Sequence, residues 1–246
     1  MDRRLRSFLA DKQGRFGIYF EDLVTGESYG LDDSKPLPAA SVVKVPIVLY
    51  LYQRVADGHV NLDRRVAYQA ETDYEGGDGV LRHVAREGDT YSLRVLANLA
   101  ITISDNIATR MLIRYLGKRN IIQFMRSIGC TTVYPGGDNI ASARDAGTYV
   151  KAALRFAEKH QELGRLFLDD LANSIYHVGL PGGVPAQVVV AHKEGSLDDV
   201  ANDAGVVFAA RPFVLAVFSA DIQDVDQGFL DIAAITRIVY ESQGPH

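Results

Sequence analysis

Residues 39–50 read AASVVKVPIVLY, and they place a serine and a lysine at the start of an apolar segment in the middle of the chain. Apolar residues recur at mostly helical intervals over 41–57, and Gly58 supplies a stop. Positions i and i+3 of a helix are neighbours, so the Lys44 amine lies within reach of the Ser41 hydroxyl. Burial lowers the pKa of a lysine, and a neutral amine can take the proton of a serine. The stretch therefore predicts a serine nucleophile, although S-x-x-K also arises by chance on the order of once in a chain of this size.

A polar triplet, Ser104-Asp105-Asn106, interrupts two apolar helical patterns at residues 92–103 and 107–116. All three residue types cap helices well, so one explanation is simply the start of the second helix. Between two buried helices, however, a polar triplet needs partners. In that position a serine hydroxyl is able to relay a proton, and an asparagine amide is able to hold a carbonyl.

A third polar run, HKEGS at residues 192–196, ends an apolar strand pattern. A lysine at a strand end, here Lys193, is usually solvated. The neighbouring Gly195 permits another backbone to come close, which would place Lys193 in a cleft instead. The residues themselves leave both alternatives open.

The rest of the chain reads as strands at both ends and helices in the centre. Residues 3–12 predict a short helix, and two alternating runs around Thr25-Gly26 predict a β-hairpin. Further helical patterns cover 119–128, 142–158, about 161–175 and 225–242, and strands are predicted within AQVVVAHKEG, ANDAGVVFAA and PFVLAVFS. We therefore expect an α/β fold of the α+β, multi-domain type.

The two ends of the chain are expected to form one antiparallel sheet, flanked by the terminal helices. An all-helical lobe would be inserted into it. This interpretation assigns residues 1–35 and 184–246 to the sheet lobe and residues 36–183 to the helical lobe, with the active site at their interface.

Composition excludes several other classes of protein. The chain has 246 residues, of which 47% are hydrophobic. Its net charge of −5 does not favour binding to nucleic acid, which is itself negatively charged. No apolar run approaches the ~20 residues of a membrane helix. The first residues lack the apolar core of a signal peptide, so we expect either a cytoplasmic protein or one whose leader has been removed. Cys130 stands alone and the six histidines are scattered, so the sequence predicts no metal site and no cofactor.

Taken together and in this order, S-x-x-K at 41–44, S-D-N at 104–106 and K-x-G at 193–195 resemble the motifs of the penicillin-recognising serine hydrolases. Within that superfamily the chain looks most like class A β-lactamases. The segments GVLRHV, SLRVLANLAITISDN, ARDAGTYV and VAHKEGSL are similar to that family, and the resemblance covers nearly the whole chain. It implies the β-lactamase/transpeptidase-like fold.

The resemblance also implies a catalytic role for each matching residue. Ser41 would be the acylated nucleophile, and Lys44 would take part in its deprotonation. Ser104 would pass a proton to the leaving nitrogen. The backbone N–H groups of Ser41 and Ser196 would form the oxyanion hole.

Substrate binding would fall to Asn106 and to the K-x-G strand, while Asp105 would be structural. Asn106 would hold a side-chain amide of the substrate, and Lys193 would supply positive potential near its carboxylate. Glu194 departs from the family pattern, because a threonine or serine normally stands between that lysine and Gly195. An ionised Glu194 would repel a nearby carboxylate by roughly 1–4 kcal/mol. Either Glu194 turns away, or it pairs with a lysine, or the substrate differs.

The segment IGCTTVYPGGDNIASARD is short in comparison with the family. Ser104 and Lys193 are 89 residues apart, where class A enzymes have on the order of a hundred. The missing length falls where those enzymes carry an omega loop, whose glutamate positions the deacylating water. Asp138 lies near that place with Asn139 beside it, and Asp138-Asn139 could be a truncated remnant with a shorter carboxylate. However, PGGDN has turn chemistry throughout, and we favour the turn.

The sequence therefore predicts a β-lactamase-like serine hydrolase that transfers the acyl group of a β-lactam to Ser41 and then hydrolyses it. Without a placed base for water, deacylation should be slower than acylation. Two alternatives stay open. One is a D,D-peptidase or small ester or amide hydrolase on the same scaffold, and the other is a non-catalytic protein that traps β-lactams. The expected partner is a small molecule, either a β-lactam or an acyl peptide or ester, and the sequence does not indicate an oligomeric state.

Overall fold

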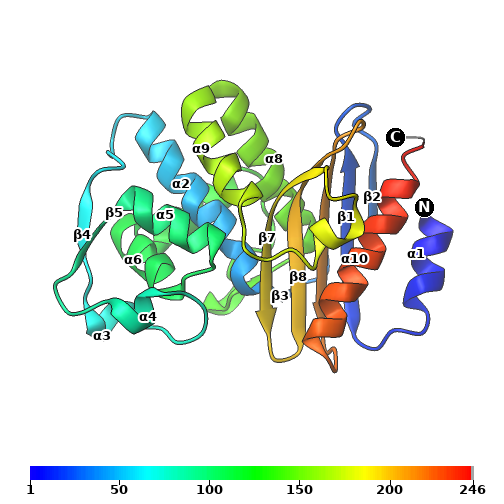
Figure 1. Ribbon diagram of the computed structural model, residues 1–246, viewed down its shortest axis with the longest axis horizontal. Helices are drawn as coiled ribbons and strands as arrows, with labels where there is room; N and C mark the ends of the chain where they lie inside the picture. The colour runs from blue at the N-terminus through cyan, green and yellow to red at the C-terminus, as the bar shows by residue number, and fades with distance from the viewer. Residues whose placement is uncertain (245–246) are drawn as a thin grey trace.

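The computed structural model describes residues 1–244 of the chain (Figure 1). Its longer helices match the predicted ones to within a few residues at each end. The α-helices are α1 (Asp2–Leu9), α2 (Lys44–Ala56), α3 (Ala70–Asp73), α4 (Leu81–Val84), α5 (Leu93–Thr102), α6 (Asn106–Leu116), α7 (Lys118–Ser127), α8 (Ala143–Lys159), α9 (Gln161–Ala172) and α10 (Val225–Glu241). Short 3₁₀ helices are η1 (Ala40–Val43), η2 (Pro135–Gly137) and η3 (Leu180–Gly183).

A five-stranded antiparallel sheet has the strand order β2-β1-β9-β8-β7. Its strands are β1 (Arg15–Asp22), β2 (Ser28–Leu31), β7 (Val189–Leu197), β8 (Val200–Phe208) and β9 (Phe213–Ala220). The two ends of the chain meet where Arg15 of β1 pairs with Ala220 of β9. The sequence expectation of a hairpin and three later strands in one sheet is confirmed, and β7, the strand with the HKEGS run, forms an edge.

Helices cover both faces of this sheet (Figure 1). The terminal helices α1 and α10 pack on the outer face, in a core cluster with Leu5, Phe213 and Ile232. On the inner face α8 comes so close to β1 that a Cβ on Gly147 would lie 2.2 Å from the Tyr19 ring. Because both faces are covered, β9 is buried along its whole length and reads as a continuous apolar run.

The helical part of the molecule is built around α2, whose residues Val45 to Leu49 are all buried. Helices α5, α6, α7, α8 and α9 all contact it. Two small sheets that the sequence did not predict complete this part of the molecule. Strand β3 (Leu37–Pro38) pairs with β6 (Ile140–Ala141), and β4 (Arg65–Ala67) pairs with β5 (Thr90–Ser92).

The start of α2 differs from the uniform helix predicted over 41–57. Residues Ala40–Val43 form a 3₁₀ turn, and the α-helix begins only at Lys44. Pro46 explains the difference, because it has no N–H to donate to the carbonyl of Val42, four residues earlier. The tighter turn satisfies the carbonyls of Ser41 and Val42 through the Lys44 N–H instead.

Over residues 1–244, no helix combines the length and the apolar character that crossing a membrane requires.

Candidate active site

The Lys44 amine joins the first two motifs of the sequence. Its side chain is buried, and Nζ donates hydrogen bonds to the Ser104 carbonyl at 2.6 Å, to Ser104 Oγ at 3.0 Å and to Asn106 Oδ1 at 2.7 Å. Lys44 is the first residue of α2, and Ser41 lies one turn earlier in η1. Within residues 1–244, the Ser41 hydroxyl itself makes no hydrogen bond to the protein.

Burial sets the protonation behaviour of Lys44. Loss of solvation, assisted by the positive charge of Lys193, lowers the pKa of Lys44 to about 7. The carboxylates of Asp78, Asp105 and Glu75 oppose this shift. A substantial fraction of the amine is therefore neutral near pH 7, as the sequence interpretation of SVVK requires of a base.

The S-D-N segment holds its shape through Asp105. One carboxylate oxygen accepts from the N–H of Ala108 at 2.9 Å, which is an N-cap, and the other accepts from the N–H of Leu81 at 2.9 Å. Ser104 has a left-handed backbone with φ +56°, which a side-chain-bearing residue adopts only under constraint. Asp105 therefore caps the helix, whereas Ser104 and Asn106 contact the Lys44 amine.

Strand β7 brings Lys193 to the same region. Its side chain is completely buried, Nζ donates to the Glu194 carbonyl at 2.8 Å, and the ammonium lies 5.5 Å from the centre of the Tyr176 ring. Burial lowers the pKa of Lys193 to about 8. The alternative of a solvated strand end is thereby excluded.

The Glu194 carboxylate does not pair with Lys193. Successive side chains of a strand point to opposite faces, and no salt bridge joins these two residues. Across the sheet Glu194 faces Asp203, whose carboxylate binds His192 Nδ1 at 2.8 Å and the Leu180 N–H at 2.8 Å. In residues 1–244, no hydrogen-bond donor reaches the Glu194 carboxylate. Burial raises its pKa to about 7.

Gly195 lets β7 approach Ser41. A Cβ on Gly195 would lie 2.5 Å from the backbone nitrogen of Ser41 and 3.0 Å from that of Val42. Any larger residue would therefore push the strand away from η1. Ser196, the next residue, lines the cavity into which Ser41 opens.

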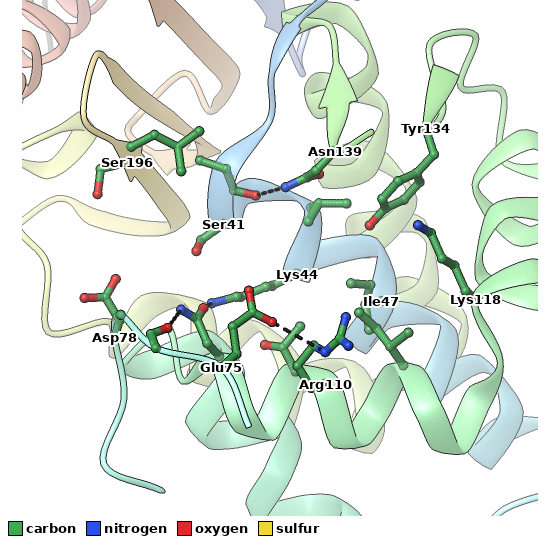
Figure 2. A pocket seen from close by; sticks show the side chains of 18 of the residues that line it. Ser41, Lys44, Ile47, Glu75, Asp78, Arg110, Lys118, Tyr134, Asn139 and Ser196 are labelled. Atoms are coloured by element: carbon green, nitrogen blue, oxygen red, sulfur yellow. Dashed lines mark hydrogen bonds and ion pairs between the residues drawn. The ribbon is translucent and has the colours of Figure 1, made fainter. Parts of the chain in front are cut away.

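That cavity has a volume of about 900 Å³ (Figure 2). Of the sequence-predicted site residues, Ser41, Lys44, Asn106 and Ser196 line it, whereas the side chains of Ser104, Lys193 and Glu194 are more deeply buried. Other lining residues are Ala40, Ile47, Glu75, Gly76, Gly77, Asp78, Thr109, Arg110, Ile113, Lys118, Tyr134, Gly137, Asn139, Leu197 and Asp198.

The loop at residues 75–79 forms one wall of the cavity. It is tied to the S-D-N segment, because Asn106 Nδ2 donates to the Gly76 carbonyl at 2.7 Å and the Asn106 N–H donates to the Asp78 carbonyl at 3.1 Å. The glycine-rich EGGDG composition was the only signal in the sequence for this close approach.

The shortened segment brings Asn139, and not Asp138, to the cavity. Asp138 is exposed and follows the turn at Pro135–Gly137, in agreement with the favoured turn interpretation. Asn139 Nδ2 donates to the Ala40 carbonyl at 2.9 Å, and the Asn139 carbonyl accepts from the Ala39 N–H at 2.9 Å. The sequence pointed to Asn139 only as the neighbour of Asp138 in the turn. The pairing of β3 with β6, which was not predicted, brings Asn139 to Ala40, next to Ser41.

Among residues 1–244, no group of three or more His, Cys, Asp or Glu side chains is arranged to hold a metal ion.

A serine, a buried lysine and a second serine meet at the head of a central helix, beside the edge strand of an antiparallel sheet. This combination of fold and site defines the serine hydrolases of the penicillin-recognising type. The chain belongs to the β-lactamase enzyme family, whose model matches residues 1–243.

Individual relatives are distant but cover the whole fold. A β-lactamase from Bacteroides uniformis is 27% identical, over 98% of this chain and 90% of that protein. Penicillin-binding protein PBP-A, solved as an L158E mutant in an acyl-enzyme complex with penicillin G, superposes with a TM-score of 0.90 at 26% identity, covering 98% of this chain and 95% of that one. A variant of the last common ancestor of class A β-lactamases of Gram-negative bacteria gives a TM-score of 0.86 at 26% identity, covering 98% and 97% of the two chains.

Proposed function

We propose that this protein transfers the acyl group of a β-lactam to Ser41 Oγ and then hydrolyses the acyl-enzyme, with deacylation the slower half. The observation that carries the proposal is the Lys44 amine, buried at the cavity floor and hydrogen-bonded to Ser104, with its pKa lowered to about 7. A neutral amine one helical turn from a serine hydroxyl is a suitable general base for it.

Acylation would transfer one proton from Ser41 to the leaving nitrogen by way of Lys44 and Ser104. Lys44 accepts the Ser41 proton while Oγ attacks the ring carbonyl. Ser104 gives its hydroxyl proton to the nitrogen as the amide C–N bond breaks, and the proton held by Lys44 then passes to Ser104 across their 3.0 Å hydrogen bond, so that both side chains return to their starting state. The backbone N–H groups of Ser41 and Ser196 would bind the oxyanion, in line with the close approach of β7 to η1. Asn106 and Lys193 would orient the substrate.

A D,D-peptidase activity is the second candidate. It is favoured by the shortened segment, which contributes Tyr134, Gly137 and Asn139 to the cavity lining and no carboxylate. An amide substrate larger than a β-lactam would fit such a cavity.

Intact-protein mass spectrometry with a fluorescent penicillin tests the proposal. We expect one adduct per chain, its absence in Ser41→Ala, and its retention in Ser7→Ala, a control at an exposed serine of α1. Release of the adduct over time measures deacylation. Absence of any adduct, together with Ser41-dependent cleavage of D-alanyl peptides or simple esters, would favour the second candidate. Absence of both activities would mean a non-catalytic protein and overturn the proposal.

A further inference from the structure

Deacylation needs a general base that takes a proton from the attacking water. The cavity offers a carboxylate for this on the loop at residues 75–79, and not on the shortened segment. The acidic residues that line it are Glu75, Asp78 and Asp198. Figure 2 shows the Glu75 side chain reaching into the cavity from the loop at residues 75–79, with Ser41 and Asn139 on the other side. We propose that Glu75 is the general base that activates the deacylating water, and this inference rests on the proposed function.

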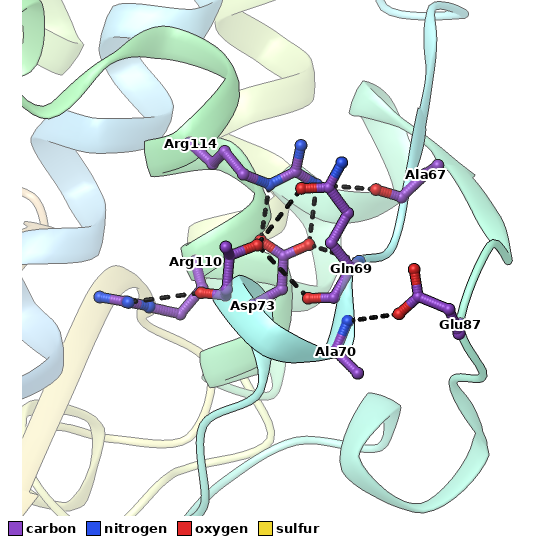
Figure 3. A network of polar contacts seen from close by, with 8 residues as sticks. Ala67, Gln69, Ala70, Asp73, Glu87, Arg110 and Arg114 are labelled. Atoms are coloured by element: carbon purple, nitrogen blue, oxygen red, sulfur yellow. Dashed lines mark hydrogen bonds and ion pairs between the residues drawn. The ribbon is translucent and has the colours of Figure 1, made fainter.

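Glu75 is held in place on both sides along the chain. Two residues earlier, the fully buried Asp73 binds Arg114 of α6 through two hydrogen bonds of 2.7 Å and accepts the Gln69 N–H at 2.9 Å (Figure 3). One residue later, the Gly76 carbonyl accepts from Asn106 Nδ2. The loop is therefore anchored to α6, and a rigid support is what a catalytic group requires.

The Glu75 carboxylate is oriented by an ion pair and is open to solvent. Its carboxylate lies 3.5 Å from Arg110 Nε, and Arg110 also donates to the Thr72 carbonyl at 3.4 Å, so the cation is fixed beside it. The Glu75 charge also acts on the Lys44 amine, which places the two groups within electrostatic range of each other. About half of the Glu75 side chain is exposed, so water reaches it.

Asn139 offers a hydrogen-bond acceptor on the side of the cavity opposite Glu75 (Figure 2). Its Nδ2 is committed to the Ala40 carbonyl, and within residues 1–244 its Oδ1 accepts no hydrogen bond. A water that Glu75 binds inside the cavity would face an acyl group on Ser41, and Asn139 Oδ1 is a further acceptor on the opposite side of the cavity. Asp78 lies on the Ser196 side of the cavity, away from Asn139 (Figure 2).

The step balances without any further reactant. Glu75 accepts one proton of the water as its oxygen forms a bond to the ester carbon. The C–Oγ bond then breaks, and the proton returns to Ser41 Oγ. One water has been added, a carboxylic acid leaves, and the protein returns to its starting state.

The test measures acylation and deacylation separately, by mass spectrometry of the penicilloyl adduct after a single turnover. Glu75→Gln should leave the acylation rate within about twofold and lengthen the adduct lifetime at least tenfold, since a general base contributes about 10²–10⁴ in rate. Glu75→Asp should restore part of the loss. Glu71→Gln, at an exposed glutamate of α3, is the matched control and should change neither rate.

Two results would overturn the assignment. One is an unchanged adduct lifetime in Glu75→Gln, and the other is equal slowing of both steps, which a merely structural residue would cause. Slow deacylation in Asp78→Asn with a normal Glu75→Gln would give the role to Asp78. If wild-type protein forms no adduct at all, the proposed function fails, and that outcome differs from each of these.

Discussion

Lys44 illustrates how a few contacts give a charged side chain a function. A lysine in an apolar helix start is costly unless it loses its proton or finds acceptors. Here three acceptors, two on Ser104 and one on Asn106, hold the amine, while burial brings its pKa to about 7. The amine is therefore poised between its two forms in the pH range where most enzymes work.

The pH dependence of acylation follows from this pKa. Only neutral Lys44 accepts a proton, so the second-order acylation rate should rise about tenfold per pH unit below 7 and level off above it. Glu194, whose pKa is raised to about 7, ionises over the same range and acts in the opposite direction, because its charge repels a substrate carboxylate. Stopped-flow acylation from pH 5 to 9 measures both effects.

Glu194→Gln is the control for that profile. It should keep the rising limb and remove a decline that begins near pH 7. A decline that remains above pH 8 would come from Lys193, which loses its positive charge there because its pKa is about 8. If the rising limb disappears with Glu194, the titration does not belong to Lys44.

Glu194 also bears on which substrates are accepted. At pH 8 its carboxylate is mostly ionised and, within residues 1–244, has no hydrogen-bond donor. Glu194→Thr should therefore speed acylation by carboxylate-bearing β-lactams, by about fivefold for each kcal/mol of repulsion removed. The acylation rate at pH 8 measures this. An unchanged rate would show that Glu194 does not face the substrate.

At the scale of elements, the position of α6 decides whether the motifs meet. Asp105 both caps α6 and binds the backbone of α4, so it fixes the S-D-N segment against the wall of the cavity. Asn106 then ties the same segment to the 75–79 loop.

Asp105→Ala should cost about 2–4 kcal/mol of unfolding free energy, because it removes a cap and leaves the buried Leu81 N–H without a partner. Asp224→Ala removes an exposed cap of α10 and should cost only about 1 kcal/mol. Urea denaturation compares the two variants, and equal losses would contradict the double role of Asp105.

Periodicity predicted the helices and strands well, and the three motifs predicted which of them meet. Local exceptions escaped prediction for identifiable reasons. The 3₁₀ turn at Ser41 depends on one absent N–H at Pro46, and the position of Asn139 depends on the two-residue pairing of β3 with β6. Glu75 was not predicted, because no periodicity marks a glycine-rich loop. The position of that loop depends on contacts with distant residues such as Asn106.

At the scale of the whole molecule, the helical part and the sheet share one core. A single buried cluster joins Tyr19 and Phe218 of the sheet to Val48 and Tyr149 of the helices. The division at residues 1–35, 36–183 and 184–246 stays a prediction. The cavity lies where β7 meets η1 and α6, so both parts contribute walls.

Pairing of β1 with β9 has a consequence for biosynthesis. A ribosome makes β1 long before its central neighbour β9, which emerges only with residues 213–220. Until then the β1–β2 hairpin has an open edge, and contacts so distant in sequence form slowly. The helix that carries the nucleophile is likewise complete long before β7 arrives beside it. The site is therefore assembled only after β7 and β9 have been made, and nascent chains truncated before residue 189 should be inert.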